Sequence, residues 1–238
     1  MIFDNISSNE KINKWINESY RECRSSYPLP LNGKVAVDIG ANVGGFCIHA
    51  HKSFDKIYAF EPLLENYNIA NQVLKTLNID NVDLYNTAIF SETGKTMPIY
   101  ANSKTKISGD ASIITGDFTN EFVDSGQVCE TMSLKDAMIS LGLNKISYLK
   151  LDCEGSEYAI LENFNDYDKI DWICMEIHGF YGAERKNDLL SKLHKHFHFA
   201  DIQRVGYFTI NDVIMNVENI ESLENLHNLL LINRNLKI

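Results

Sequence analysis

The fold is decided by a stretch near the N-terminus, Val35-Ala36-Val37-Asp38-Ile39-Gly40-Ala41-Asn42-Val43-Gly44-Gly45-Phe46. A run rich in β-branched residues ends at an acid, a turn of small residues follows, and an apolar segment begins directly after the turn. This order predicts a strand, a tight loop and a helix. Glycines in such a loop let a ligand approach the backbone, and the first turn of the helix offers free N–H groups. The stretch therefore predicts a ligand-binding loop.

The glycine pattern distinguishes this loop from the commoner dinucleotide-binding loop. A Gly-x-Gly-x-x-Gly fingerprint opens directly after its strand and places its glycines beneath a pyrophosphate. Here the strand ends in Asp38, and the pattern is Asp-x-Gly-x-Asn-x-Gly. A carboxylate would repel a pyrophosphate but would attract a cationic sulfonium and an amino-acid ammonium. The pattern resembles motif I of class I S-adenosylmethionine-dependent methyltransferases, and the alternative is a glycine-rich turn without a ligand.

Composition and charge narrow the class of protein. With 238 residues, 45% of them hydrophobic and 23% charged, the chain is typical of one soluble α/β domain covering residues 1–238. The net charge of -10 argues against nucleic acid and anionic membrane as partners, because both are bound through clustered Lys and Arg. Five widely spaced cysteines without a Cys-x-x-Cys pair favour a reducing compartment. With no signal-like or membrane-spanning run in the sequence, we expect a cytoplasmic protein.

Strand-like and helix-like segments alternate along the chain. Such alternation predicts an α/β fold with a doubly wound, mostly parallel sheet, here of seven strands. We expect an N-terminal helical extension in residues 1–32 and an irregular insertion in residues 92–132 that contains two strand-like segments and partly orders as a lid. Residues 205–225 form a second irregular stretch. The expected strands are residues 34–38, 57–60, 82–87, 146–151, 170–177, 199–204 and 229–233, and the expected helices of the domain are residues 44–52, 62–77, 154–164 and 184–196.

Glu61 ends the second expected strand, 23 positions after Asp38. A carboxylate there can accept hydrogen bonds from both ribose hydroxyls of a nucleoside. The alternative is an acid favoured by the helix macrodipole, since Pro62 would sit in the first turn of the next helix. Asn86 and Ala88 end the third strand, where an adenine ring would lie, and a plain turn is the alternative for Asn86.

A second informative stretch is Tyr148-Leu149-Lys150-Leu151-Asp152-Cys153-Glu154-Gly155-Ser156-Glu157. In a doubly wound sheet its strand lies beside the first strand, so Asp152 should point at the transferred methyl group. Glu154 and Glu157 are three positions apart, and we expect them to share a helix face. The alternative is that these acids only complement the dipole of a first helical turn.

His178 follows the fifth expected strand, in Met175-Glu176-Ile177-His178-Gly179. It is placed to take a proton from an acceptor hydroxyl, and an ordinary histidine pKa of about 6.5 suits a base near neutral pH. A histidine that caps a loop or bonds Glu176 is the alternative. Asp152, Glu154, Glu176 and His178 could together accept a Mg²⁺-like ion. No spacing motif demands such an ion, so we predict no metal site and leave the metal requirement open.

Several of these segments together resemble the FkbM family of methyltransferases, over about residues 33–180: motif I, Phe60-Glu61-Pro62, residues 150–157, and Glu176-Ile177-His178. The resemblance implies S-adenosylmethionine as methyl donor, S-adenosylhomocysteine as product, and O-methylation of a sugar, a polyketide or a related small molecule. It also implies that Ser112 lies in a loop near the amino-acid end of the cofactor. The predicted cofactor-binding residues are Asp38, Gly40, Ala41, Asn42, Gly44, Phe46, Glu61, Pro62, Asn86, Ala88, Ser112 and Asp152. The predicted catalytic residues are His178, Asp152 and Glu154, with His178 or Asp152 as the base.

Two other functions remain as alternatives. The first is a nicotinamide-dependent oxidoreductase of the same architecture, against which the missing second glycine of the dinucleotide spacing argues. The second is a protein that binds S-adenosylmethionine without catalysis, against which Asp152, Glu154 and His178 argue. We expect the methyl acceptor to be a small molecule or a glycan, but no sequence pattern identifies it. No sequence pattern identifies the oligomeric state either.

Overall fold

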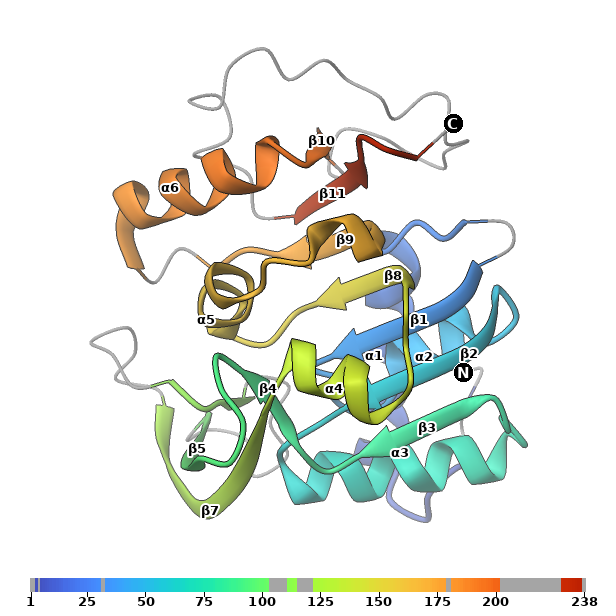
Figure 1. Ribbon diagram of the computed structural model, residues 1–238. Helices are drawn as coiled ribbons and strands as arrows, with labels where there is room; N and C mark the ends of the chain where they lie inside the picture. The colour runs from blue at the N-terminus through green and yellow to red at the C-terminus, as the bar shows by residue number, and fades with distance from the viewer. Residues whose placement is uncertain are drawn as a thin grey trace.

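A seven-stranded sheet forms the centre of the molecule, which we describe from a computed structural model (Figure 1). The strands lie in the order β10-β11-β9-β8-β1-β2-β3, and β11 runs antiparallel to both of its neighbours. Their bounds are Gly33–Ile39 (β1), Phe54–Phe60 (β2), Val82–Tyr85 (β3), Ile146–Leu151 (β8), Ile170–Glu176 (β9), Phe197–Asp201 (β10) and Asn228–Asn233 (β11). The structure describes residues 3, 5–30, 33–102, 111–114, 122–178, 181–201 and 228–236.

The strand order confirms the expected fold class. From β1 the chain proceeds through β2 and β3 in one direction, and then through β8 and β9 in the other, with parallel pairing throughout these five strands. The order of the strands therefore reverses between β1 and β8, and a crevice opens beyond the carboxyl ends of the strands at such a point. This is the Rossmann-like fold of class I methyltransferases.

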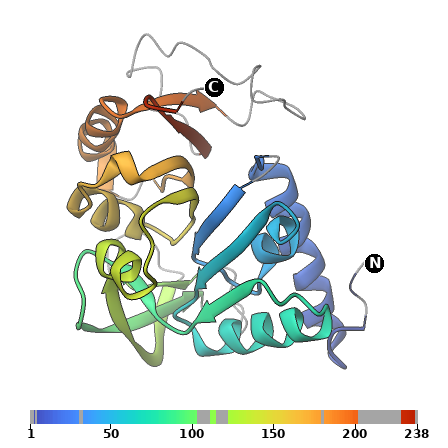
Figure 2. The ribbon, with the colours of Figure 1, turned by 45° about the vertical axis from the view of Figure 1, so that its right-hand side comes forward.

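Helices cover both faces of the sheet, because successive side chains of a strand point to opposite faces. Ala36 and Tyr148 belong to the core beneath α1 (Glu10–Ser26), α2 (Gly45–Ala50) and α3 (Leu64–Thr76). Val37 and Leu149, their neighbours along the strands, belong to the core beneath α4 (Leu134–Ser140), α5 (Ser156–Asn163) and α6 (Gly182–His194). Figure 2 shows the blue helices α1 and α2 on one side of the sheet and α4 to α6 on the other.

The N-terminal extension forms the expected amphipathic helix, α1. Asn9 caps it by accepting a hydrogen bond from the backbone N–H of Lys11, and Ile16 is fully buried. The helix packs tightly on α2, since a Cβ on Gly45 would lie 2.8 Å from the backbone oxygen of Ser19. None of the helices in the described part of the chain is long and apolar enough to cross a bilayer.

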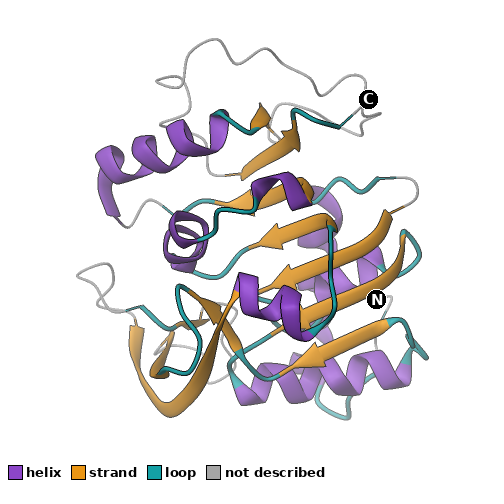
Figure 3. Cartoon of the chain, in the orientation of Figure 1, coloured by secondary structure: helices purple, strands orange, loops and turns teal. Residues whose placement is uncertain are grey.

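The expected insertion is more regular than its composition indicates. A second sheet has the order β4-β7-β5-β6 and buries a small apolar core that includes Ile99 and Ile113 (Figure 3). Its strands are Ala88–Phe90 (β4), Thr96–Asn102 (β5), Ala111–Ser112 (β6) and Phe122–Ser133 (β7), so the two strand-like segments predicted here are confirmed. Residues 103–110, 115–121 and 202–227 lie outside the described residues, and a lid over the site stays a prediction.

The helix starts lie within two residues of expectation, and two of the differences affect predicted site residues. The helix after Pro62 begins at Leu64, so the proline precedes the helix instead of lying in its first turn. The helix after β8 begins at Ser156, because Glu154 and Gly155 have left-handed backbone angles, with φ of 51° and 96°. Glu154 therefore does not share a helix face with Glu157, and the expectation that it does is wrong.

Candidate active site

A cavity of about 350 Å³ lies at the carboxyl ends of the central strands. Parallel strands bring these ends to one edge of the sheet, so loops that are distant in the sequence meet there. The loops after β1, β2, β8 and β9 all contribute, and α1 forms a further wall. Ten of the predicted site residues line the cavity: Gly40, Ala41, Asn42, Phe46, Glu61, Pro62, Ala88, Asp152, Glu154 and His178.

Gly40 holds the loop after β1 against the end of β8. Its φ of 80° is in the left-handed region, and a Cβ there would lie 1.8 Å from the backbone oxygen of Asp152. The N–H groups of Gly40 and Ala41 both donate to the backbone oxygen of Phe60, at 3.0 Å. The glycine is therefore required for the loops after β1, β2 and β8 to meet.

Glu61 is held in the cavity wall by the backbone. Its Oε2 accepts a hydrogen bond from the N–H of Asn42 at 2.8 Å, and its Oε1 accepts one from the N–H of Leu63 at 2.9 Å. Burial raises the pKa of Glu61 to about 7, although these two backbone donors act to lower it. Each carboxylate oxygen has a further lone pair, so the group can still accept bonds from a ligand.

Lys150 is a site residue that the sequence analysis missed. Its Nζ lies 3.1 Å from Asp38 Oδ1 and 3.8 Å from Asp152 Oδ2, and it donates to the backbone oxygen of Gly40 at 2.6 Å. Burial alone would lower the pKa of Lys150, but the carboxylates of Asp38 and Asp152 outweigh burial and raise it. A lysine inside an apolar central strand was the available signal, because such a residue needs an acidic neighbour.

Asp38 consequently lies beneath the cavity instead of in its wall. It pairs with Lys150 across the β1–β8 register, and its side chain is fully buried. The prediction placed this carboxylate next to the cationic sulfur of a ligand, whereas the structure places it against a cation of the protein. Its effect on a ligand would be exerted through Lys150.

Asp152 is fixed by a residue from the N-terminal segment. Its Oδ2 accepts a hydrogen bond from the hydroxyl of Tyr27 at 2.8 Å, and Tyr27 is almost completely buried. No sequence pattern links two residues 125 positions apart, so Tyr27 was not found. The same segment lines the cavity with Trp15, Glu18, Ser19, Glu22 and Cys23.

His178 lies between two carboxylates. Its Nδ1 is 3.2 Å from Glu157 Oε1 and its Nε2 is 3.3 Å from Glu154 Oε2. Burial would lower the pKa of His178, but the hydrogen bond with Glu157 and the charges of Glu157, Glu154 and Asp152 raise it to about 10. The imidazole is therefore a cation at neutral pH and has no lone pair for a proton. The pKa of His178 therefore differs from the ordinary value that the sequence analysis expected, and its role as the base stays a prediction.

Besides Asp38, three further predicted cofactor residues do not line the cavity. Asn86 donates to the backbone oxygens of Glu61 and Pro62, which is the plain-turn alternative. Ser112 Oγ donates to the backbone oxygen of Glu154 at 2.8 Å. Gly44 caps α2 with a φ of 86°. All three hold loops that do line the cavity, so their contact with a ligand stays a prediction.

Side chains with the donor atoms of a metal site gather on the β8–β9 side of the cavity. One ligand atom each of Asp152, Glu154 and His178 lies within 4.8 Å of the others, and Glu176 Oε1 is 4.0 Å from His178 Nε2. Two carboxylates and an imidazole would suit a divalent cation if His178 were neutral. The metal requirement, which the sequence left open, stays open. The candidate ligands in the structure are the same residues that the sequence indicated.

Comparison with known proteins identifies the family. The profile described as "Methyltransferase FkbM domain" matches residues 38–216, which contain the loop after β1, Glu61, Asp152 and His178. The chain belongs to the FkbM methyltransferase domain family. The resemblance seen in the sequence is thereby confirmed, and α1 and Tyr27 precede the matched residues.

One sequence relative agrees with this assignment. The FkbM protein of Streptomyces tacrolimicus, named 31-O-demethyl-FK506 methyltransferase, is 30% identical over 179 residues, which are 63% of this chain and 68% of the relative. A crystal structure of methyltransferase FkbM from Methylobacillus flagellatus has a TM-score of 0.49 at 14% identity, and its match covers 90% of this chain. This chain spans half the length of that protein. An rRNA methylase from Streptococcus thermophilus has a TM-score of 0.45 at 13% identity, over 92% of this chain and 95% of its own. At these TM-scores the two structures carry no weight for function.

Proposed function

We propose that this FkbM-family protein transfers a methyl group from S-adenosylmethionine to a hydroxyl group of a sugar or another small molecule. The observation that carries the proposal is Glu61, a carboxylate in the cavity wall at the carboxyl end of β2, beside the glycine loop after β1. Both of its oxygens are oriented by backbone N–H groups, and both retain capacity for the two ribose hydroxyls. An acid in this place is the usual partner of a nucleoside ribose in such folds.

The charge of the cavity favours a cationic donor. Among the described residues that line it, six are acidic and two, Lys150 and His178, are basic. S-adenosylmethionine carries a positive sulfur and an ammonium group, and both are attracted by nearby carboxylates. A pyrophosphate, as in a nicotinamide dinucleotide, would meet the same carboxylates unfavourably.

The chemistry needs few protein groups. The acceptor oxygen attacks the methyl carbon in line, the carbon–sulfur bond breaks with its electron pair going to sulfur, and the hydroxyl proton leaves as the new bond forms. We propose that the carboxylate of Asp152 accepts the hydroxyl proton, because the cationic imidazole of His178 cannot accept it. His178 would instead balance the charges of Glu154 and Glu157 beside the acceptor.

A hydroxyl acceptor has support from one relative. The name 31-O-demethyl-FK506 methyltransferase denotes transfer to an oxygen of a small molecule. A sugar, glycan or other hydroxylated metabolite fits the proposal for this chain, and a screen of such compounds with labelled methyl donor would identify the acceptor.

Calorimetry with S-adenosylhomocysteine tests the cofactor assignment without an acceptor. We expect the wild-type protein to bind it and the Glu61→Gln variant to bind about 30-fold more weakly, since a hydrogen bond to a charged group contributes about 1.5–3 kcal/mol. Glu65→Gln is the matched control, because Glu65 accepts a hydrogen bond from Gln127 Nε2 and does not line the cavity. Absence of binding by the wild type, or equal binding by Glu61→Gln, would overturn the proposal.

A further inference from the structure

The N-terminal segment forms one wall of the cavity, although it precedes the residues that define the family. The family profile begins at residue 38, whereas α1 and the turn after it supply Trp15, Glu22, Cys23 and Tyr27 to the cavity. Figure 1 shows α1 behind β1, on the face of the sheet that also carries α2. This segment therefore contributes to the cavity from outside the residues that the family profile matches.

Tyr27 is held rigidly within that segment. Its ring meets the ring of Phe46 edge-on, with centroids 5.8 Å apart, and its backbone oxygen lies 3.0 Å from His49 Nε2. Lys150 Nζ lies 5.6 Å from the centre of the same ring. These contacts leave the hydroxyl directed at one atom, Asp152 Oδ2, at 2.8 Å. A ring held in this way places its hydroxyl without losing rotamer freedom on binding a ligand.

Asp152 has a competing partner in Lys150. The oxygen that accepts from Tyr27 lies 3.8 Å from Lys150 Nζ, which is beyond the usual length of a hydrogen bond. Lys150 is closer to Asp38, at 3.1 Å. Without the tyrosine hydroxyl, the attraction of Asp152 toward Lys150 would be opposed less strongly, and we expect the carboxylate to turn toward Lys150 and away from the cavity.

We propose that Tyr27 is a positioning residue that keeps the carboxylate of Asp152 at the cavity surface and so strengthens the preference for the positively charged methyl donor over its neutral product. The inference rests on the proposed function, because the donor and the product differ by one positive sulfur and one methyl group. A carboxylate near that sulfur attracts the donor and gains nothing from the product.

The test compares affinities for S-adenosylmethionine and S-adenosylhomocysteine by calorimetry in the wild type and in Tyr27→Phe, which removes only the hydroxyl. We expect the affinity for S-adenosylmethionine to fall about fivefold more than that for S-adenosylhomocysteine, the size of one typical hydrogen bond. Tyr20→Phe is the matched control. Tyr20 is on α1, packs against Phe3 and borders a different hollow of the surface, so its loss should leave both affinities unchanged.

A double-mutant cycle distinguishes positioning from a merely structural role. In an Asp152→Asn background, Tyr27→Phe should not change the affinity ratio further, because the charge that it positions is gone. If Tyr27→Phe left the ratio of the two affinities unchanged, whether or not both affinities fell, the inference would be overturned while the proposed function stands. A wild-type protein that binds neither ligand would instead overturn the proposed function itself.

Discussion

The two ends of the cavity hold their charges by different means. At the end formed by β1 and β2, Glu61 is oriented by two backbone N–H groups. One of them is 19 positions away along the chain, and the second is two positions away. At the end formed by β8 and β9, Asp152 and His178 are oriented by other side chains, and the Tyr27 hydroxyl comes from 125 positions away. Backbone partners follow from the local chain path, whereas side-chain partners require the whole fold.

This difference has an energetic consequence. A carboxylate that is bonded to neutral backbone groups keeps a pKa set mainly by burial, and can change its charge near neutral pH. Side chains that pair with one another depend on each partner, so the loss of one leaves a buried charge without compensation. We therefore expect the first end to respond to pH through ligand binding, and the second to respond through stability.

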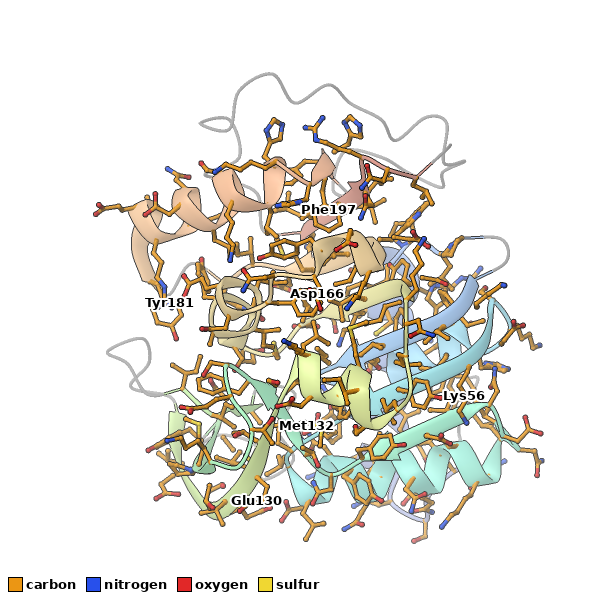
Figure 4. All side chains as sticks on the ribbon, in the orientation of Figure 1. Lys56, Glu130, Met132, Asp166, Tyr181 and Phe197 are labelled. Carbon is orange, nitrogen blue, oxygen red and sulfur yellow. The ribbon has the colours of Figure 1, made fainter. Side chains whose placement is uncertain are left out.

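The largest effect is expected from breaking the buried ion pair. Lys150→Met leaves Asp38 as an uncompensated charge and should lower the free energy of unfolding by about 3–5 kcal/mol. Lys56→Met is the control: Lys56, labelled in Figure 4, pairs with Asp83 at 2.7 Å near solvent, and its loss should cost no more than about 1 kcal/mol. Urea denaturation measures both, and similar losses would remove the distinction between buried and exposed pairs.

The second-largest effect follows from the raised pKa of His178, which makes the free energy of unfolding depend on pH. The folded-state pKa of about 10 lies above the ordinary 6.5, so the stabilisation is complete below pH 6.5 and is lost as pH rises toward 10. We expect a decline of a few kcal/mol over that window. His178→Gln should flatten the decline, in denaturation curves measured at several pH values. A wild type whose stability is constant from pH 6.5 to 10 would contradict a charged His178.

At the other end of the cavity, Glu61 should make ligand binding depend on pH. With a pKa of about 7, its ionised fraction rises strongly between pH 6 and pH 8, and only the ionised group accepts both ribose hydroxyls. Affinity for S-adenosylhomocysteine should therefore increase by up to about tenfold over that range. In Glu61→Gln calorimetry should find a flat profile. Tighter binding at pH 6 than at pH 8 would reverse the sign that burial of Glu61 requires.

The smallest effect concerns Asn86, which bonds the backbone oxygens of Glu61 and Pro62. Asn86→Ala should lower the free energy of unfolding by about 1 kcal/mol through these lost hydrogen bonds. If Asn86 also contacts an adenine ring, as the sequence predicts, affinity for S-adenosylhomocysteine will fall as well. Thermal unfolding together with calorimetry separates the two roles, and unchanged affinity would leave Asn86 as a turn residue.

Much of the fold and the first end of the cavity could be predicted from the sequence. Alternating apolar segments indicated the strands of the sheet, and Asp38, Gly40 and Glu61 marked the loops at its carboxyl edge. These features depend on neighbours along the chain, as with Gly40, whose left-handed backbone only glycine adopts easily. Asp38 was the exception, because its partner is on another strand.

The sequence by itself determined the α/β fold, the glycine loop after β1, and the strand-end acids Glu61 and Asp152. Only the tertiary structure decided that Lys150 forms an ion pair with Asp38 and that the Tyr27 hydroxyl donates a hydrogen bond to Asp152. The same is true of the position of His178, as a cation between Glu154 and Glu157. The physical reason is distance along the chain: a backbone conformation is set by a few adjacent residues, whereas the charge of a buried side chain is set by whatever the fold packs against it.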